Sequence, residues 1–135
     1  LHVKNGKAEN ILPKIRYKVD LILTSPPYLD IERYFDSKTN KHVSGSGDVN
    51  VYLTTFLFPV LSQCVRILKK GGILALNIND DPKGKYICKT ILAFMANKQQ
   101  VKLIGTFGYK MFLNPGAGGH TSKPVAEPIY IWKKK

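Results

Sequence analysis

Apolar residues occur along the chain in two patterns, short runs and longer stretches with helical spacing. The short runs Val19–Thr24 and Ile73–Ile78 predict two buried strands of a parallel sheet. Apolar positions with helical spacing lie between them and predict a long helix facing the sheet. We expect this helix to begin at Asp48, to be kinked at Pro59 and to end at Gly71-Gly72.

The remaining pattern predicts an alternating order of elements. Residues 29–50 are polar and predict a long irregular loop, a kind of segment that is usually functional. The other expected elements are a short strand ending at Val3, a helix over Ala8–Ile15 interrupted by Pro13, a helix opened by Asp80-Asp81-Pro82, and strands over Val101–Met111 and Pro128–Trp132. This order favours an α/β fold with a mostly parallel sheet and a C-terminal antiparallel hairpin.

Length and composition limit the class of protein. The chain has 135 residues, of which 44% are hydrophobic, and this predicts one globular domain. It contains no run of about 20 apolar residues and no signal-peptide pattern, so we expect an intracellular, cytoplasmic protein of microbial or viral context. Cys64 and Cys88 are expected to be reduced core residues. The three histidines have no ligand spacing, and no metal site is expected.

The chain is strongly basic. It carries 21 Lys and Arg against 9 Asp and Glu, a net charge of +12. Such an excess favours a polyanionic partner, because phosphate contacts supply most of the non-specific affinity for nucleic acid. Two lysine clusters, Lys69-Lys70 and Lys133–Lys135, are, taken singly, more typical of a solvated helix end and a solvated tail than of a binding site. The charge of the whole chain therefore carries this inference, and the single clusters do not.

The sequence Ser25-Pro26-Pro27-Tyr28 follows the first predicted strand directly. Proline cannot continue a strand ladder, so the strand ends here, at the sheet edge where α/β proteins bind ligands. The two prolines hold the carbonyl between them rigidly, beside a hydroxyl and an aromatic ring. This arrangement suits a planar ring that carries an amino group. The alternative is an ordinary proline-terminated turn with a surface tyrosine.

This tetrapeptide resembles the Asp/Asn/Ser-Pro-Pro-Tyr/Phe signature of the S-adenosylmethionine-dependent amino methyltransferases of DNA. The resemblance implies a Rossmann-like sheet and transfer of a methyl group from S-adenosylmethionine to the exocyclic amino group of adenine or cytosine. It implies that Ser25 and the Pro26 carbonyl accept hydrogen bonds from this amino group. Pro27 completes the catalytic motif, and Tyr28 stacks on a base flipped out of the helix.

Two other segments resemble turns of the same family, Leu68–Gly72 and Glu127–Tyr130. The resemblance therefore spans nearly the whole chain, as a single catalytic domain over residues 1–135. One motif of the family, a glycine-rich Phe-x-Gly-x-Gly cofactor turn after a strand, is not found, because Ser44–Gly47 follows a polar loop. The sequence is thus compatible with a partial domain or one subunit of a split enzyme, with a partner chain or missing segment supplying this turn, and with a homodimer.

The resemblance also implies further site residues. Thr24 and Ser25 are candidate cofactor contacts, together with Asn5 and Gly6. These two begin the stretch Asn5-Gly6-Lys7-Ala8, where many relatives have Gly-Asp-Ala and this chain has lysine in place of the acid. The candidate contacts to the base or to DNA lie in two loop regions and are Asp30, Glu32, Lys38, Lys41, Lys110, His120 and Lys123. The same residues are also compatible with a capped helix start and an ordinary hairpin loop.

Three functions remain open from the sequence. The first is a site-specific DNA methyltransferase forming N6-methyladenine or N4-methylcytosine, as found in restriction-modification systems. The second is an amino methyltransferase of RNA, because related pockets also occur there, and substrate competition separates these two. The third is a non-catalytic nucleic-acid-binding subunit of a split methyltransferase, which would not bind S-adenosylmethionine by itself.

Overall fold

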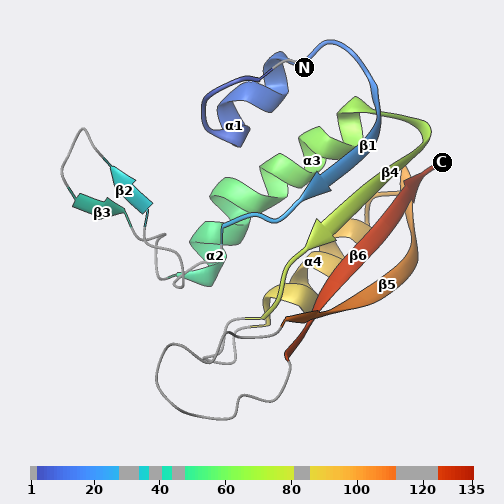
Figure 1. Ribbon diagram of the computed structural model, residues 1–135. Helices are drawn as coiled ribbons and strands as arrows, with labels where there is room; N and C mark the ends of the chain where they lie inside the picture. The colour runs from blue at the N-terminus through green and yellow to red at the C-terminus, as the bar shows by residue number, and fades with distance from the viewer. Residues whose placement is uncertain (1–2, 28–33, 37–40, 44–47, 81–85, 112–124) are drawn as a thin grey trace.

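The computed structural model describes residues 3–27, 34–36, 41–43, 48–80, 86–111 and 125–135. Its centre is a four-stranded sheet in the order β1-β4-β6-β5 (Figure 1). The strands are β1 (Val19–Thr24), β4 (Leu68–Asn77), β5 (Val101–Met111) and β6 (Val125–Lys134). β1 and β4 are parallel, whereas β6 runs antiparallel to both β4 and β5. The predicted α/β class and C-terminal hairpin are confirmed. The sheet is mixed and not mostly parallel, because two of its three strand pairings are antiparallel.

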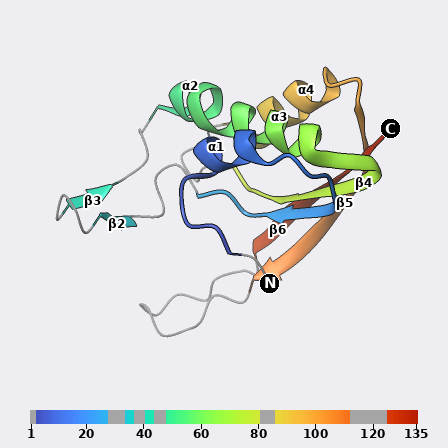
Figure 2. The same ribbon diagram turned by 90° about the horizontal axis from the view of Figure 1, so that it is seen from above.

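The helices cover one face of this sheet (Figure 2). They are α1 (Ala8–Ile11) with a 3₁₀ turn at Leu12–Lys14, the continuous segment α2 (Val49–Val51), η2 (Tyr52–Leu57) and α3 (Phe58–Ile67), and α4 (Ile87–Ala96). Their buried side chains form one core with the covered face, including Leu61, Leu74, Leu76, Ile91 and Trp132. One layer of helices thus packs on one face of the sheet, as expected for half of a Rossmann-like fold.

Asp48 and Pro59 explain where the long helix begins and where its turn becomes wider. Asp48 is the N-cap, as predicted, because its carboxylate accepts hydrogen bonds from the backbone N–H groups of Asn50 at 2.7 Å and Val51 at 3.3 Å. The π-helical segment η2 lies just before Pro59. Proline has no N–H group and its ring crowds the carbonyl of the residue four positions earlier, and a wider turn relieves this contact.

The end of this helix was predicted wrongly. α3 ends at Ile67 and β4 begins at Leu68, so Gly71 and Gly72 lie inside the strand and do not end the helix. The register between β1 and β4 shifts between Val19 and Leu21. Gly71 has a φ of +79°, and a Cβ on Gly72 would lie 2.9 Å from a backbone oxygen. The glycines therefore permit a bulge in β4.

Several boundaries differ from the prediction. A small antiparallel hairpin, β2 (Tyr34–Asp36) and β3 (Lys41–Val43), lies within the loop that was expected to be irregular. Val3 belongs to no strand, and α4 begins at Ile87, after the predicted opening. The local sequence pattern did not predict these short strands or the start of α4, because tertiary contacts determine where such elements form.

The face of the sheet opposite the helices is open. Leu21 and Leu23 of β1 are 61% and 71% exposed, and Ile104 and Phe107 of β5 are 52% and 64% exposed. The expectation that β1 is a buried strand is therefore wrong. β1 is an edge strand, and in the described chain only its second face packs on helices, through partly buried Ile22.

The two cysteines are buried and free, as predicted. Burial raises the pKa of each thiol to about 11. Both are therefore protonated at neutral pH and act as small apolar core residues. In the described part of the chain, no helix is long and apolar enough to span a membrane.

Candidate active site

The candidate site lies where β1 and β4 end side by side. Thr24 and Leu76 are register partners, so Ser25, which follows β1, lies beside Asn77, the last residue of β4. The Ser25 hydroxyl donates a hydrogen bond to the Asn77 side-chain oxygen at 3.3 Å. Because its hydrogen points to Asn77, the lone pairs of Ser25 Oγ are available to accept from a ligand.

Asn77 is itself held by the next strand. Its Nδ2 donates to the Pro128 carbonyl of β6 at 3.4 Å, and the backbone N–H of Ile78 donates to the same carbonyl at 3.3 Å. These contacts fix the orientation of the amide, with its oxygen toward Ser25 and its nitrogen toward β6. Three strands thus contribute to the placement of one serine hydroxyl.

The two prolines are held by the long helix. Pro26 is buried and Pro27 is partly buried. The buried Tyr52 of η2 donates its hydroxyl hydrogen to the Pro27 carbonyl at 2.9 Å. No described residue donates to the carbonyl of Pro26, which remains an acceptor beside Ser25. The local backbone is rigid because proline fixes φ and Tyr52 anchors the carbonyl that follows.

The titratable groups at the end of β4 have structural partners. The Asp80 carboxylate accepts from the backbone N–H of Cys88 at 2.7 Å and so connects β4 to α4. The Cys88 thiol contacts the Ile78 carbonyl at 3.5 Å. Burial, followed by a hydrogen bond to Cys88, raises the pKa of Tyr130 above its usual range. Neither the thiol nor this phenol is ionised at neutral pH, so neither supplies a base.

Most of the other predicted site residues lie outside the described residues. These are Tyr28, Asp30, Glu32, Lys38, His120 and Lys123. Lys41 lies in β3 and Lys110 in β5, opposite Ala126, and only their backbone positions are described. The structure therefore brings together Thr24, Ser25, Pro26 and Pro27 of the predicted set, and adds Asn77 and Tyr52 to them.

Asn5 and Gly6, predicted near the cofactor, lie in the exposed segment before α1. Gly6 has a φ of +151°, and a Cβ there would lie 2.8 Å from the Ile11 side chain. A local turn therefore explains this glycine without a ligand. No described contact joins Asn5 or Gly6 to Ser25.

Sequence reasoning missed two residues of the site. Asn77 had a usable signal, since it is a polar residue that interrupts the apolar run at the end of its strand. Tyr52 had none, because its ring occupies a normal core position of an amphipathic helix and only its hydroxyl contacts the site. The described residues contain no group of three His, Cys, Asp or Glu that could hold a metal ion.

The arrangement presents two oxygen acceptors, Ser25 Oγ and the Pro26 carbonyl, on a rigid turn at the carboxyl edge of the sheet. Such a pair fits a ligand with two N–H donors on one nitrogen, which is the donor pattern of a primary amino group. The described site has no activated nucleophile and no ionised thiol. Its chemistry is the orientation of an amine.

Three of the solved structures that are similar to this chain have names that describe methylases. A protein from Thermus thermophilus, provisionally named a DNA modification methylase, has a TM-score of 0.64 at 21% identity, with 96% of this chain and 52% of that chain covered. Its complex with S-adenosyl-L-methionine gives 0.62 at 22% identity, with 96% and 53% covered. A protein from Clostridium thermocellum, provisionally named an rRNA methylase, gives 0.52 at 18% identity, with 98% and 59% covered.

These likenesses establish the Rossmann-like fold, and the chain spans about half the length of the Thermus protein. A comparison with curated protein sequences gave no match. The model of the N6/N4-type DNA methylase family matches residues 19–135, from the first residue of β1 onward. The chain therefore belongs to the DNA methylase family of N6/N4 methyltransferases.

Proposed function

We propose that this chain is the amine-binding part of a DNA methyltransferase that methylates the exocyclic amino group of adenine or cytosine. The observation that carries the proposal is the hydrogen bond from Ser25 to Asn77 at 3.3 Å. It turns the serine hydroxyl into an acceptor beside the Pro26 carbonyl, in a turn that matches the family signature. Membership of the DNA methylase family supports DNA as the substrate.

In this proposal the two N–H groups of the base's amine donate to Ser25 Oγ and to Pro26 O. These bonds orient the amine and increase the electron density on its nitrogen, which then attacks an electrophilic methyl carbon in line. S-adenosylmethionine, when bound, supplies that methyl group on a sulfonium. Asn77 is a positioning residue that acts through Ser25, and Tyr28 stacks on the flipped base.

The described residues do not by themselves form a complete cofactor cradle. Among the described glycines, Gly6 and Gly71 have positive φ, and neither follows the carboxyl end of a parallel strand. A backbone approach of the kind that dinucleotide and methyl-donor turns need is therefore not found here. Thr24 and Ser25 remain candidate cofactor contacts, as do Asn5 and Gly6 by the family resemblance, and we assign the main cofactor turn to another segment or chain.

The free edge and open side of β1 are the proposed place for that segment. Parallel strands are normally covered on both faces, yet Leu21 and Leu23 are mainly exposed. β1 ends at Ser25, so a strand added beside β1 would end next to the amine acceptors. The fact that the Thermus structure in complex with S-adenosyl-L-methionine is about twice as long supports a covering segment of this size. A second copy of the chain is the competing occupant.

The test of function is transfer of a labelled methyl group from S-adenosylmethionine to unmethylated DNA and to RNA by the whole protein, that is, this chain together with the segment or partner chain that completes its cofactor cradle. We expect incorporation into DNA, and a loss of incorporation in Tyr28→Ala and in Ser25→Ala. Tyr17→Ala is the matched control, because Tyr17 is 57% exposed at the other end of β1. Exclusive labelling of RNA, or equal activity in Ser25→Ala, would overturn the proposal.

The covering segment is tested by calorimetry of the 135-residue chain with S-adenosylmethionine. We expect no saturable binding up to about 1 mM cofactor. Tight binding by the chain alone would show that it holds a complete cradle and would refute the need for a second segment. Sedimentation of the same sample identifies a second copy as the occupant if the chain is a dimer that binds cofactor.

A further inference from the structure

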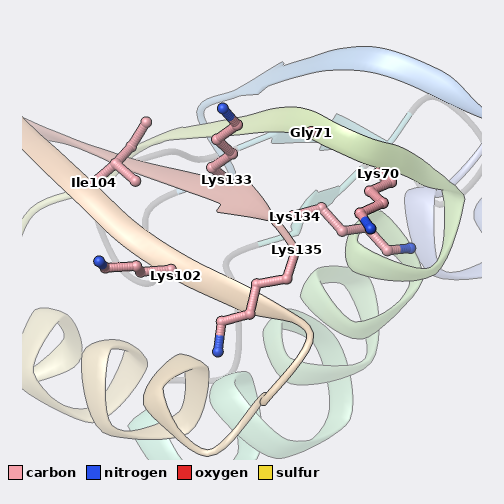
Figure 3. Close-up of a pocket in the computed structure, with 7 residues that line it drawn as sticks. All are labelled: Lys70, Gly71, Lys102, Ile104, Lys133, Lys134 and Lys135. Carbon is pink, nitrogen blue, oxygen red and sulfur yellow. The ribbon is translucent and has the colours of Figure 1, made fainter.

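The fold brings distant lysines together at the end of the sheet opposite Ser25. Here β4 begins and β6 ends, and they enclose a hollow of about 410 Å³ together with β5 (Figure 3). Gly71 and Ile104 line it, with five lysines: Lys70, Lys102, Lys133, Lys134 and Lys135. In the sequence these residues belong to three separate segments, and only the sheet order β4-β6-β5 makes them one cluster.

Two of these lysines are direct cross-strand partners. Lys102 of β5 lies opposite Lys133 of β6 in the antiparallel register. Like charges at such positions repel and destabilise a sheet. Both side chains are exposed, so their stems line the hollow while their ammonium groups reach solvent (Figure 3). A bound anion would relieve this repulsion.

Lys134 has a different role from the other four. Its ammonium donates to the carbonyl of Val65, in the last turn of α3, at 2.8 Å and to that of Leu68, just after the helix, at 2.9 Å. It therefore caps the negative end of the helix dipole and fixes one wall of the hollow. The remaining lysines, Lys70, Lys102, Lys133 and Lys135, are exposed and make no ion pair with any described residue.

No described acidic side chain lines the hollow. The one ion pair among the described residues joins Asp20 to Lys69 at 2.9 Å and so leaves the adjacent Lys70 uncompensated. The local excess of positive charge is therefore not neutralised within the described structure. This distinguishes the cluster from an ordinary surface of mixed charges.

We propose that this hollow binds the phosphodiester backbone of DNA at a distance from the reacting base. The inference rests on the proposed function for its choice of DNA. Along β4, Lys70 and Asn77 lie about 20 Å apart at the usual strand rise. Along a duplex this corresponds to about six base pairs. Across the sheet, Leu21 of β1 pairs with Ile73 of β4, and Ile73 pairs with Lys133 of β6. Lys133 is therefore two strands away from Leu21, and a segment that covers the edge of β1 leaves the hollow accessible.

The test is the salt dependence of binding to a labelled DNA duplex, measured by fluorescence anisotropy on the full chain. The hollow variant is Lys70→Ala/Lys102→Ala/Lys133→Ala. The matched control is Lys4→Ala/Lys7→Ala/Lys89→Ala, which removes the same charge from exposed lysines elsewhere. If the three lysines contact phosphates, the slope of log Kd against log salt falls by about 2.7 in the hollow variant and much less in the control.

Equal slopes in the two variants would overturn the proposal, because the effect would then be one of net charge. A change in affinity for inorganic pyrophosphate without a change for DNA would also overturn it, since the hollow would then be a small-anion site. Methyl transfer is scored separately. A reduced slope without any transfer by the whole protein, with its cofactor cradle complete, refutes the proposed function alone, whereas Ser25-dependent transfer with an unchanged slope refutes this inference alone.

Discussion

The Ser25 hydroxyl and the Asn77 side-chain oxygen lie 3.3 Å apart across the ends of two parallel strands. Because Asn77 also donates to Pro128, its two atoms have separate roles. The oxygen orients Ser25, and the nitrogen connects β4 to β6. A pair of substitutions can therefore separate the function of this residue from its structural contribution.

Asn77→Asp keeps an acceptor for Ser25 and loses the donor to Pro128, whereas Asn77→Leu loses both. We expect similar losses of stability in the two variants. We expect the kcat for DNA methylation to fall about fivefold further in Asn77→Leu, since one hydrogen bond contributes about 1 kcal/mol. Steady-state kinetics beside urea unfolding checks this. Equal kcat values in the two variants would show that Asn77 does not act through Ser25.

Tyr52→Phe removes the hydrogen bond to the Pro27 carbonyl and leaves the ring in the core. We expect the free energy of unfolding to fall by about 1 kcal/mol, because a partly buried carbonyl loses its partner. Urea titration measures this loss. Tyr17→Phe, at an exposed position, is the control and should leave the unfolding midpoint unchanged. A similar small effect in both variants would mean that Tyr52 does not hold the proline turn.

Leucines on the two faces of the sheet should respond very differently to truncation. Leu76→Ala opens a cavity in the core and should lower the free energy of unfolding by about 2–5 kcal/mol. Leu23 lies on the open face of the neighbouring strand β1, and Leu23→Ala should change the free energy of unfolding by less than about 0.5 kcal/mol. Chemical denaturation of both variants decides the matter. A large loss in Leu23→Ala would show that this face is already covered in the free chain.

The buried thiols predict a dependence of stability on alkaline pH. The pKa of Cys64 and of Cys88 rises from 9.0 to about 11 on folding, so the folded state holds these protons more tightly. The unfolded chain ionises first, and stability therefore decreases as pH rises from 9 to 11, by about 1 kcal/mol per pH unit for each thiol. Unfolding curves across this range measure the slope.

The double variant Cys64→Ala/Cys88→Ala supplies the comparison for the alkaline experiment. It lacks both thiols, and its stability should depend less steeply on pH over this range than that of the parent chain. Parallel slopes in the two proteins would contradict the assignment of the effect to the thiols. The ordinary reagent iodoacetamide offers a second readout, since protonated buried thiols react slowly in the folded state.

Local patterns predicted the elements that local chemistry controls. The bounds of Val19–Thr24 and Val101–Met111 are those of β1 and β5, and Asp48 caps its helix as expected. The end of α3 was misplaced because Gly71-Gly72 resembles a helix stop and in fact permits a strand bulge. The exposure of Leu21 and Leu23 was missed because an apolar run does not reveal whether a neighbouring segment covers it.

The candidate site was predictable only in part. Ser25-Pro26-Pro27 is recognisable from its strand and its prolines, and the fold places it at the sheet edge as expected. The contacts of Asn77, Tyr52 and Pro128 depend on strand register and helix packing between segments that are distant in the sequence, which no local pattern encodes. The lysine hollow likewise depends on the order in which the strands pair.

The most direct test of the central claim is the identity of the methylated nucleoside in DNA treated with the whole protein and S-adenosylmethionine. Mass spectrometry of the digested DNA should find N6-methyladenine or N4-methylcytosine, and the Ser25→Ala protein should lose this product. Methylation on a ring carbon, such as 5-methylcytosine, or an unchanged yield in Ser25→Ala would contradict an amine held by Ser25 and Pro26.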